Sequence, residues 1–86
     1  MTSQKVTLTA PHGMHARPAG ELVRLVKSLD GKIRLATEVK SIDASSMLAL
    51  LSLGLKSGTE IEVTAEGGDE QGNLQRVVAF LASIRD

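Results

Sequence analysis

Cysteine, tryptophan and tyrosine are absent from this chain of 86 residues, and phenylalanine occurs once, as Phe80. Without cysteine the chain can form no disulfide and no thiolate metal site, which fits a reducing, cytoplasmic location. With a single aromatic ring, stacking on bases or sugars is not available as a way of binding ligands. The hydrophobic core must therefore be aliphatic.

The chain also lacks an excess of charge and a long hydrophobic run. Lys and Arg number 10 and Asp and Glu number 10, so the formal net charge is zero. This balance removes the usual electrostatic case for nucleic-acid binding. No apolar run approaches the length of a membrane span, and the N-terminus lacks the apolar segment of a signal peptide. We expect one cytoplasmic domain over residues 1–86, monomeric, without a cofactor and without membrane insertion.

Hydrophobic periodicity predicts elements in the order βαββαβα. The predicted strands cover residues 5–9, 32–37, 41–44 and 60–66. The predicted helices begin near Pro18, at 47 and after Gly67-Gly68-Asp69, and they end near Leu29, at Leu53 and near Ile84. Strand residues expected to face inward are Val6, Leu8, Ile33, Leu35, Ile61, Val63 and Ala65. Because only one face of each strand is apolar, we expect a two-layer α+β open sandwich. On the other, solvated face, acidic and basic side chains are expected to pair across strands.

The segment Pro11-His12-Gly13-Met14-His15-Ala16-Arg17-Pro18-Ala19 runs directly into the first helical pattern. Pro18 suits the first turn of a helix, so His15 is predicted to lie at the helix N-terminus. The unpaired N–H groups and the positive dipole at that end favour an anion. Imidazole is a nucleophile at neutral pH, and Arg17 can reach back to a phosphoryl oxygen. The pattern predicts a phosphohistidine site; a capping or solvated histidine is the alternative on spacing alone.

A partner surface is predicted beside this histidine. One arc of the first helix carries Arg17, Gly20, Arg24 and Lys27, and the second helix adds Met47, Leu48 and Leu51. A basic rim around an apolar centre favours an acidic protein partner. The alternative is that the charges only solvate the helix and that the apolar side chains belong to the core.

Two other classes of site are less well supported. His12 and His15 could both bind a metal ion, but they supply at most two ligands, whereas a closed zinc site needs about four. No second base or carboxylate accompanies His15, which argues against a hydrolase. A small metal-binding module remains the distant alternative.

The string Gly13-Met14-His15-Ala16-Arg17-Pro18-Ala19, with Ser46-Met47 and Ser52-Leu53-Gly54-Leu55 downstream, resembles HPr. HPr is the phosphocarrier of the bacterial phosphoenolpyruvate-dependent sugar phosphotransferase system. The resemblance implies a four-stranded antiparallel sheet of order 1-4-2-3. It implies that His15 accepts a phosphoryl group on Nδ1 from phospho-enzyme I and passes it to a sugar-specific enzyme IIA, aided by Arg17. It also implies regulation by phosphorylation at Ser46, with an HPr kinase/phosphorylase and a transcriptional regulator as further partners.

Within this resemblance, a paralogue that serves a nitrogen-related or purely regulatory phosphorelay is the alternative function. The chain departs from the family pattern at Glu38-Val39, where a tight turn with positive φ is not expected, and at Ser45, where relatives often carry lysine. Gly20 and Gly72 fall inside predicted helices, where each glycine costs roughly 1 kcal/mol relative to alanine.

Overall fold

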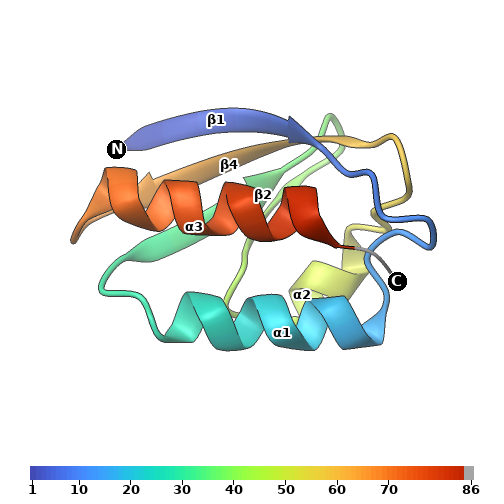
Figure 1. Ribbon diagram of the computed structural model, residues 1–86, viewed down its shortest axis with the longest axis horizontal. Helices are drawn as coiled ribbons and strands as arrows, with labels where there is room; N and C mark the ends of the chain where they lie inside the picture. The colour runs from blue at the N-terminus through green and yellow to red at the C-terminus, as the bar shows by residue number, and fades with distance from the viewer. Residues whose placement is uncertain (85–86) are drawn as a thin grey trace.

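The computed structural model describes residues 1–84 and has the predicted order of elements (Figure 1). The elements are β1 (Thr2–Thr7), α1 (Ala16–Lys27), β2 (Lys32–Ala36), β3 (Ser41–Asp43), α2 (Met47–Ser52), β4 (Glu60–Glu66) and α3 (Glu70–Ser83). The strands form one antiparallel sheet in the order β1-β4-β2-β3, and the three helices cover one of its faces. The α+β open-sandwich prediction is confirmed.

β4 is the central strand of this sheet, paired with β1 on one side and β2 on the other. Val63 lies opposite Gln4 of β1 and Leu35 of β2. Ile61, Val63 and Ala65 are fully buried, whereas the glutamates of the same strand, Glu60, Glu62 and Glu66, are exposed. Successive side chains of a strand point to opposite faces, so this alternation places the core under the helices and leaves the other face to solvent.

The core is aliphatic, as the composition requires. α1 buries Ala19, Leu22 and Val26 against it, and α3 contributes Leu74, Val77 and Leu81. The short α2 buries only Leu50. Phe80 and Val78 are partly buried at the margin of this core.

Local signals fix the ends of α2 and α3. The Oγ of Ser46 accepts a hydrogen bond from the Ala49 N–H at 3.2 Å and begins α2, and Gly54 follows that helix with φ of +64°. The Asp69 carboxylate accepts from the Gly72 N–H at 3.1 Å and begins α3. A Cβ on Gly72 would overlap this carboxylate, so a larger residue there would require the Asp69 side chain to shift. Gly20 has no such constraint, since a Cβ there would lie 3.9 Å from the Met47 Cε.

The predicted first strand is wrong in its bounds. β1 covers residues 2–7 rather than 5–9, because the polar residues Thr2 to Gln4 pair through their backbone with β4. Leu8 is buried but lies beyond the strand, and Val6 is only half-buried. The other bounds differ by at most two residues, and the predicted strand at 60–66 matches β4. Helix α1 ends at Lys27, with Ser28 as its C-cap, and α2 ends at Ser52.

The predicted pairing of charges on the uncovered face is also largely wrong. Among residues 1–84, one cross-strand ion pair forms there, between Lys5 Nζ and Glu60 Oε1 at 3.9 Å. Arg34 donates instead to the Ser41 Oγ of the neighbouring strand, at 3.1 Å from Nη2. An ion pair between long, exposed side chains contributes little free energy, because holding both side chains in one geometry costs conformational entropy. This small gain explains why most of the expected pairs do not form.

The Glu38-Val39 turn agrees with expectation. Non-glycine residues with positive φ are absent from residues 1–84, and the Thr37 N–H donates to the Lys40 carbonyl at 2.9 Å. Over the same residues, no helix is long and apolar enough to cross a membrane.

Candidate functional site

His15 is the N-cap residue of α1, as predicted. Its backbone is extended, with φ of −98° and ψ of −174°, and its carbonyl accepts the Ala19 N–H at 3.0 Å, the first bond of the helix. The imidazole itself accepts no capping hydrogen bond and is half-buried. The side chain therefore stands at the positive end of a twelve-residue helix without serving as its cap.

The sequence limits the number of backbone N–H groups at the N-terminus of α1. The first N–H groups of a helix have no carbonyl of the helix itself to bond. Ala16 and Arg17 occupy the first two positions of α1, and Pro18, at the third, has no N–H. Pro18 and Ala19 are buried, which anchors this turn in the core. An anion bound to the imidazole would meet outward-directed peptide dipoles.

The loop before His15 is fastened to the loop after α2. The Met14 N–H donates to the Leu55 carbonyl at 3.0 Å, and the Gly13 N–H donates to the Ala10 carbonyl at 3.1 Å. Gly13 has φ of +68°, and a Cβ there would overlap the Leu55 carbonyl oxygen. Met14 and Leu55 are buried on either side of this contact. The sequence analysis missed this role of Leu55, because no local pattern shows which loops meet.

Arg17 and His12 are the charged and titratable neighbours of His15 in the chain. Arg17 lies exposed in the first turn of α1. The His12 and His15 rings have centroids 6.3 Å apart and cross at 73°. Residues 1–84 contain no group of three or more His, Cys, Asp or Glu that could hold a metal ion, so nothing adds further ligands to this pair.

The predicted partner surface is brought together in part. The Gly20 position of α1 faces Met47 of α2, which is half-buried. Leu48 is 82% exposed and Leu51 is 38% exposed, so these two side chains face solvent rather than the core. Arg24 and Lys27 are exposed in the last turn of α1. We call Arg24, Lys27, Met47, Leu48 and Leu51 the basic–apolar face.

Ser46 and Ser45 differ in their bonding, although they are neighbours. The Ser46 side chain is exposed and makes the single cap bond to Ala49. Ser45 is bound twice to Asp43, through its N–H at 2.9 Å and its hydroxyl at 2.7 Å. These two bonds lower the pKa of the Asp43 carboxyl below its usual 3.8. Ser45 therefore closes a turn, and Ser46 alone presents its hydroxyl at the head of α2.

Comparison with known proteins agrees with this arrangement. The family model described as PTS HPr component phosphorylation site matches residues 2–83. The chain belongs to the HPr family. The Phosphocarrier protein HPr of Vibrio cholerae is 35% identical over 84 residues, which cover 98% of this chain and 99% of that protein. HPr proteins are phosphocarriers of the phosphotransferase system, and this chain has that role.

Solved structures of the HPr family show the same fold. A phosphocarrier protein HPr from Bacillus anthracis superposes with a TM-score of 0.89 at 26% identity and covers 93% of this chain and 95% of that one. Crh of Bacillus subtilis superposes with a TM-score of 0.75 at 33% identity, covers 94% and 93%, and is described as a domain-swapped dimer. The strand order implied by the HPr resemblance is thereby confirmed.

Proposed function

We propose that His15 is the phosphoryl acceptor, taking the group from phospho-enzyme I and passing it to an enzyme IIA. The observation that carries this proposal is the position of the imidazole: it is the N-cap residue of α1, yet its ring makes no capping bond. A lone pair on Nδ1 would form the P–N bond as the bond from phosphorus to the donor breaks. This requires the tautomer that carries its proton on Nε2.

Nδ1 is the ring nitrogen nearer to the backbone, which supports its choice over Nε2. A phosphoryl group there lies close to the first peptide dipoles of α1, and these favour negative charge by roughly 0.3–1 kcal/mol at an exposed site. A charge-assisted hydrogen bond contributes more, about 1.5–3 kcal/mol. We therefore assign the larger share to Arg17, whose guanidinium can bind two phosphoryl oxygens at once.

The basic–apolar face supports a docking role toward enzyme I and enzyme IIA. Arg24 and Lys27 supply positive charge on α1, the helix that packs against α2, and Leu48 of α2 is an apolar side chain exposed to solvent. An acidic partner surface would be steered by these charges and would cover the leucine. Such encounters are fast and weaken as salt screens the charges.

Ser46 is proposed as the regulatory phosphorylation site of the same carrier. Its hydroxyl is exposed, and Ser46 begins α2 directly before Met47 and Leu48 of the basic–apolar face. A phosphate adds about −1.5 to −2 charge, which is favourable at a helix N-terminus and unfavourable beside an acidic partner.

Incubation with enzyme I and labelled phosphoenolpyruvate tests the acceptor. We expect acid-labile label on the wild type and on His12→Ala, the matched control, and none on His15→Ala. Arg17→Ala should accept and donate the group about tenfold to a hundredfold more slowly, because a bond of about 1.5–3 kcal/mol to the phosphoryl group is lost. Retained label on His15→Ala, or label lost from His12→Ala, would overturn the assignment.

A further inference from the structure

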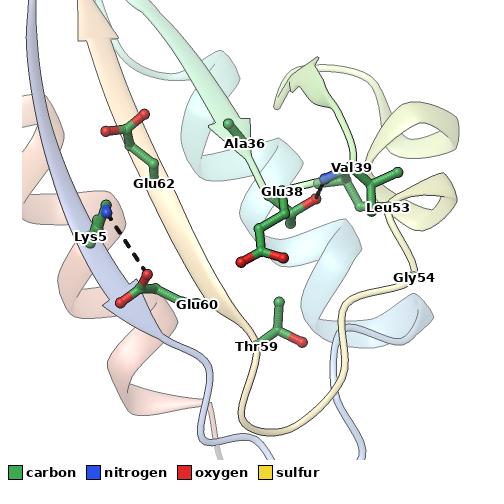
Figure 2. A pocket seen from close by; sticks show the side chains of 10 residues that line it. Lys5, Ala36, Glu38, Val39, Leu53, Gly54, Thr59, Glu60 and Glu62 are labelled. Carbon is green, nitrogen blue, oxygen red and sulfur yellow. Dashed lines mark hydrogen bonds and ion pairs between the residues drawn. The ribbon is translucent and has the colours of Figure 1, made fainter.

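The sheet face that no helix covers carries a hollow of about 520 Å³ near the β2–β3 turn (Figure 2). Strands β1, β2 and β4 form its floor, and the turn and the residues after α2 form its wall. The residues that matter for its chemistry are Lys5, Glu38, Val39, Leu53, Glu60 and Glu62. We call this the open-face hollow. None of these residues belongs to the His15 site or to the basic–apolar face.

The open-face hollow has an excess of negative charge. Its one ammonium group, on Lys5, lies 3.9 Å from Glu60, and both side chains are 65% exposed. Within residues 1–84, Glu38 and Glu62 take part in no ion pair. The neighbouring Lys40 is turned away, since its Nζ donates to the Ser52 Oγ at 3.0 Å. The lining of the hollow therefore carries three carboxylates and one ammonium group, a net charge of −2, in a chain whose net charge is zero.

The hollow also has an apolar wall. Val39 is 88% exposed, the largest exposure of any large hydrophobic residue in residues 1–84. Leu53, on the same wall, is half-buried against the core. Figure 2 shows the Glu38 side chain extending from the turn toward β4, with Val39 and Leu53 to its right in this view. An occupant that fits both features carries a positive group next to an aliphatic one.

We propose that the open-face hollow binds a short basic segment of a partner protein. A lysine or arginine side chain of that segment reaches the carboxylates of Glu38 and Glu62, and an aliphatic neighbour packs on Val39. The charge of the hollow selects this occupant and disfavours nucleic acid and anionic membranes, which are both negative. The sign is opposite to that of the basic–apolar face, so the two surfaces select partners of opposite charge. The proposal does not depend on the acceptor role of His15.

The test is a titration of the isotopically labelled protein, followed by NMR amide shifts, with a short peptide of alternating arginine and leucine. We expect saturable shifts confined to the residues of the open-face hollow. The double variant Glu38→Gln/Glu62→Gln should weaken binding about five- to tenfold, because each exposed ion pair contributes modestly. Glu66→Gln, on the same strand but outside the hollow, is the matched control and should bind as the wild type does.

Two more variants test separately the charge of the open-face hollow and its apolar wall. Lys5→Gln should tighten binding about two- to fivefold, since it removes the competing cation and leaves Glu60 to the peptide. Val39→Ser should weaken the arginine–leucine peptide and leave a peptide of alternating arginine and serine unaffected. Circular dichroism confirms that each variant folds.

Several outcomes would overturn the proposal. Shifts centred on α1 and α2, or equal affinity of the wild type and the double variant, would show that the hollow is not the binding site. Equal affinity for a glutamate–leucine peptide would show that charge does not select the occupant. Self-association in the ultracentrifuge that disappears in the double variant would assign the hollow to a second copy of this chain.

Discussion

The two ends of α1 use polar side chains in opposite ways. At its C-terminal end, on the left in Figure 1, the Asp30 carboxylate accepts from the Asp69 N–H at 3.2 Å and from Asn73 Nδ2 at 2.8 Å. These bonds join the loop after α1 to the start of α3. At its N-terminal end, on the right, the His15 imidazole makes no capping hydrogen bond.

The difference shows how one small fold divides its polar groups. At the Asp30 end they satisfy the backbone of the chain, and a buried Asn73, only 4% exposed, is among them. A buried polar group is tolerated because it is hydrogen-bonded. At the His15 end backbone hydrogen bonds hold the loop, through Gly13, Met14 and Leu55, and the His15 ring makes no capping bond. With His15 as the proposed acceptor, stability and phosphoryl transfer fall at opposite ends of one helix.

Breaking the backbone contact at the His15 end should have the largest effect. Gly13→Ala combines a positive φ with a Cβ that overlaps the Leu55 carbonyl, so we expect it to lower the free energy of unfolding by about 2–4 kcal/mol. Gly54→Ala is the control, because φ there is also positive but a Cβ would meet nothing within 4 Å. It should cost only about 1 kcal/mol. Urea unfolding measures both, and equal losses would mean that the approach to Leu55 does not matter.

Comparing the same two variants also separates the effect of Gly13 on the position of His15 from its effect on stability. At a temperature where Gly13→Ala is still folded, its His15 should accept the phosphoryl group more slowly than that of Gly54→Ala. A rate equal to that of the control would show that the contact with Leu55 supports the fold without positioning the imidazole.

Removing a hydrogen bond to Asp30 should lower stability and leave the rate of phosphoryl transfer unchanged. Asn73→Ala removes a bond between buried or partly buried groups, so we expect a loss of about 1–3 kcal/mol in unfolding free energy. Gln75→Ala, the control on the same helix, loses an exposed bond of 3.3 Å to Gln4 and should change stability little. Both variants should accept the phosphoryl group at the wild-type rate. A slower rate for Asn73→Ala would show that the two ends are coupled.

The sequence predicted the fold well where hydrophobic periodicity is strong. β4 alternates cleanly, and the capping residues Ser46 and Asp69 act within three residues of themselves, so these features can be read locally. The start of β1 was missed because its residues are polar. That strand is held by backbone bonds to β4, a segment distant in the sequence.

The site shows the same division between local and distant information. The position of His15 at the head of a helix was predictable from Pro18 and the apolar spacing that follows. The hydrogen bond from the Met14 N–H to the Leu55 carbonyl was not predictable, because it depends on how two loops meet in space. The open-face hollow likewise depends on strand register, which brings Lys5 opposite Glu62. The pattern of charges alone predicted paired, solvated side chains there.

Acid should weaken the Asp30 end. The bonds from Asn73 and from the Asp69 N–H lower the pKa of Asp30 below 3.8, and the N-terminal amine and the Gly67 N–H lower the pKa of Glu70 below 4.5. A carboxyl whose pKa is lower in the folded state stabilises above its unfolded pKa and loses that contribution as the pH falls through the folded value. We therefore expect the melting temperature to decrease as the pH is lowered below about 4.5.

Asp30→Asn sharpens this test, since its amide oxygen can still accept hydrogen bonds but has no charge to lose. Its melting temperature should be lower than that of the wild type at pH 7, and the two curves should converge as the pH decreases toward 3. Parallel curves over this range would mean that Asp30 does not contribute to the acid sensitivity.

The smallest effect on stability is expected at the head of α2. Ser46→Asp replaces one capping side chain with another and adds charge at a helix N-terminus, worth a few tenths to about 1 kcal/mol, so the melting temperature should stay equal or rise slightly. Phosphorylation of His15 by enzyme I should nevertheless slow about two- to fivefold at low salt, and less at high salt, because the new charge repels an acidic partner. Ser45→Asp is the control: it loses the hydroxyl that donates to Asp43 and sets two carboxylates together, so it should lower the melting temperature. A wild-type phosphorylation rate in Ser46→Asp would leave Ser46 as a helix cap alone, and unfolding of that variant would contradict the cap.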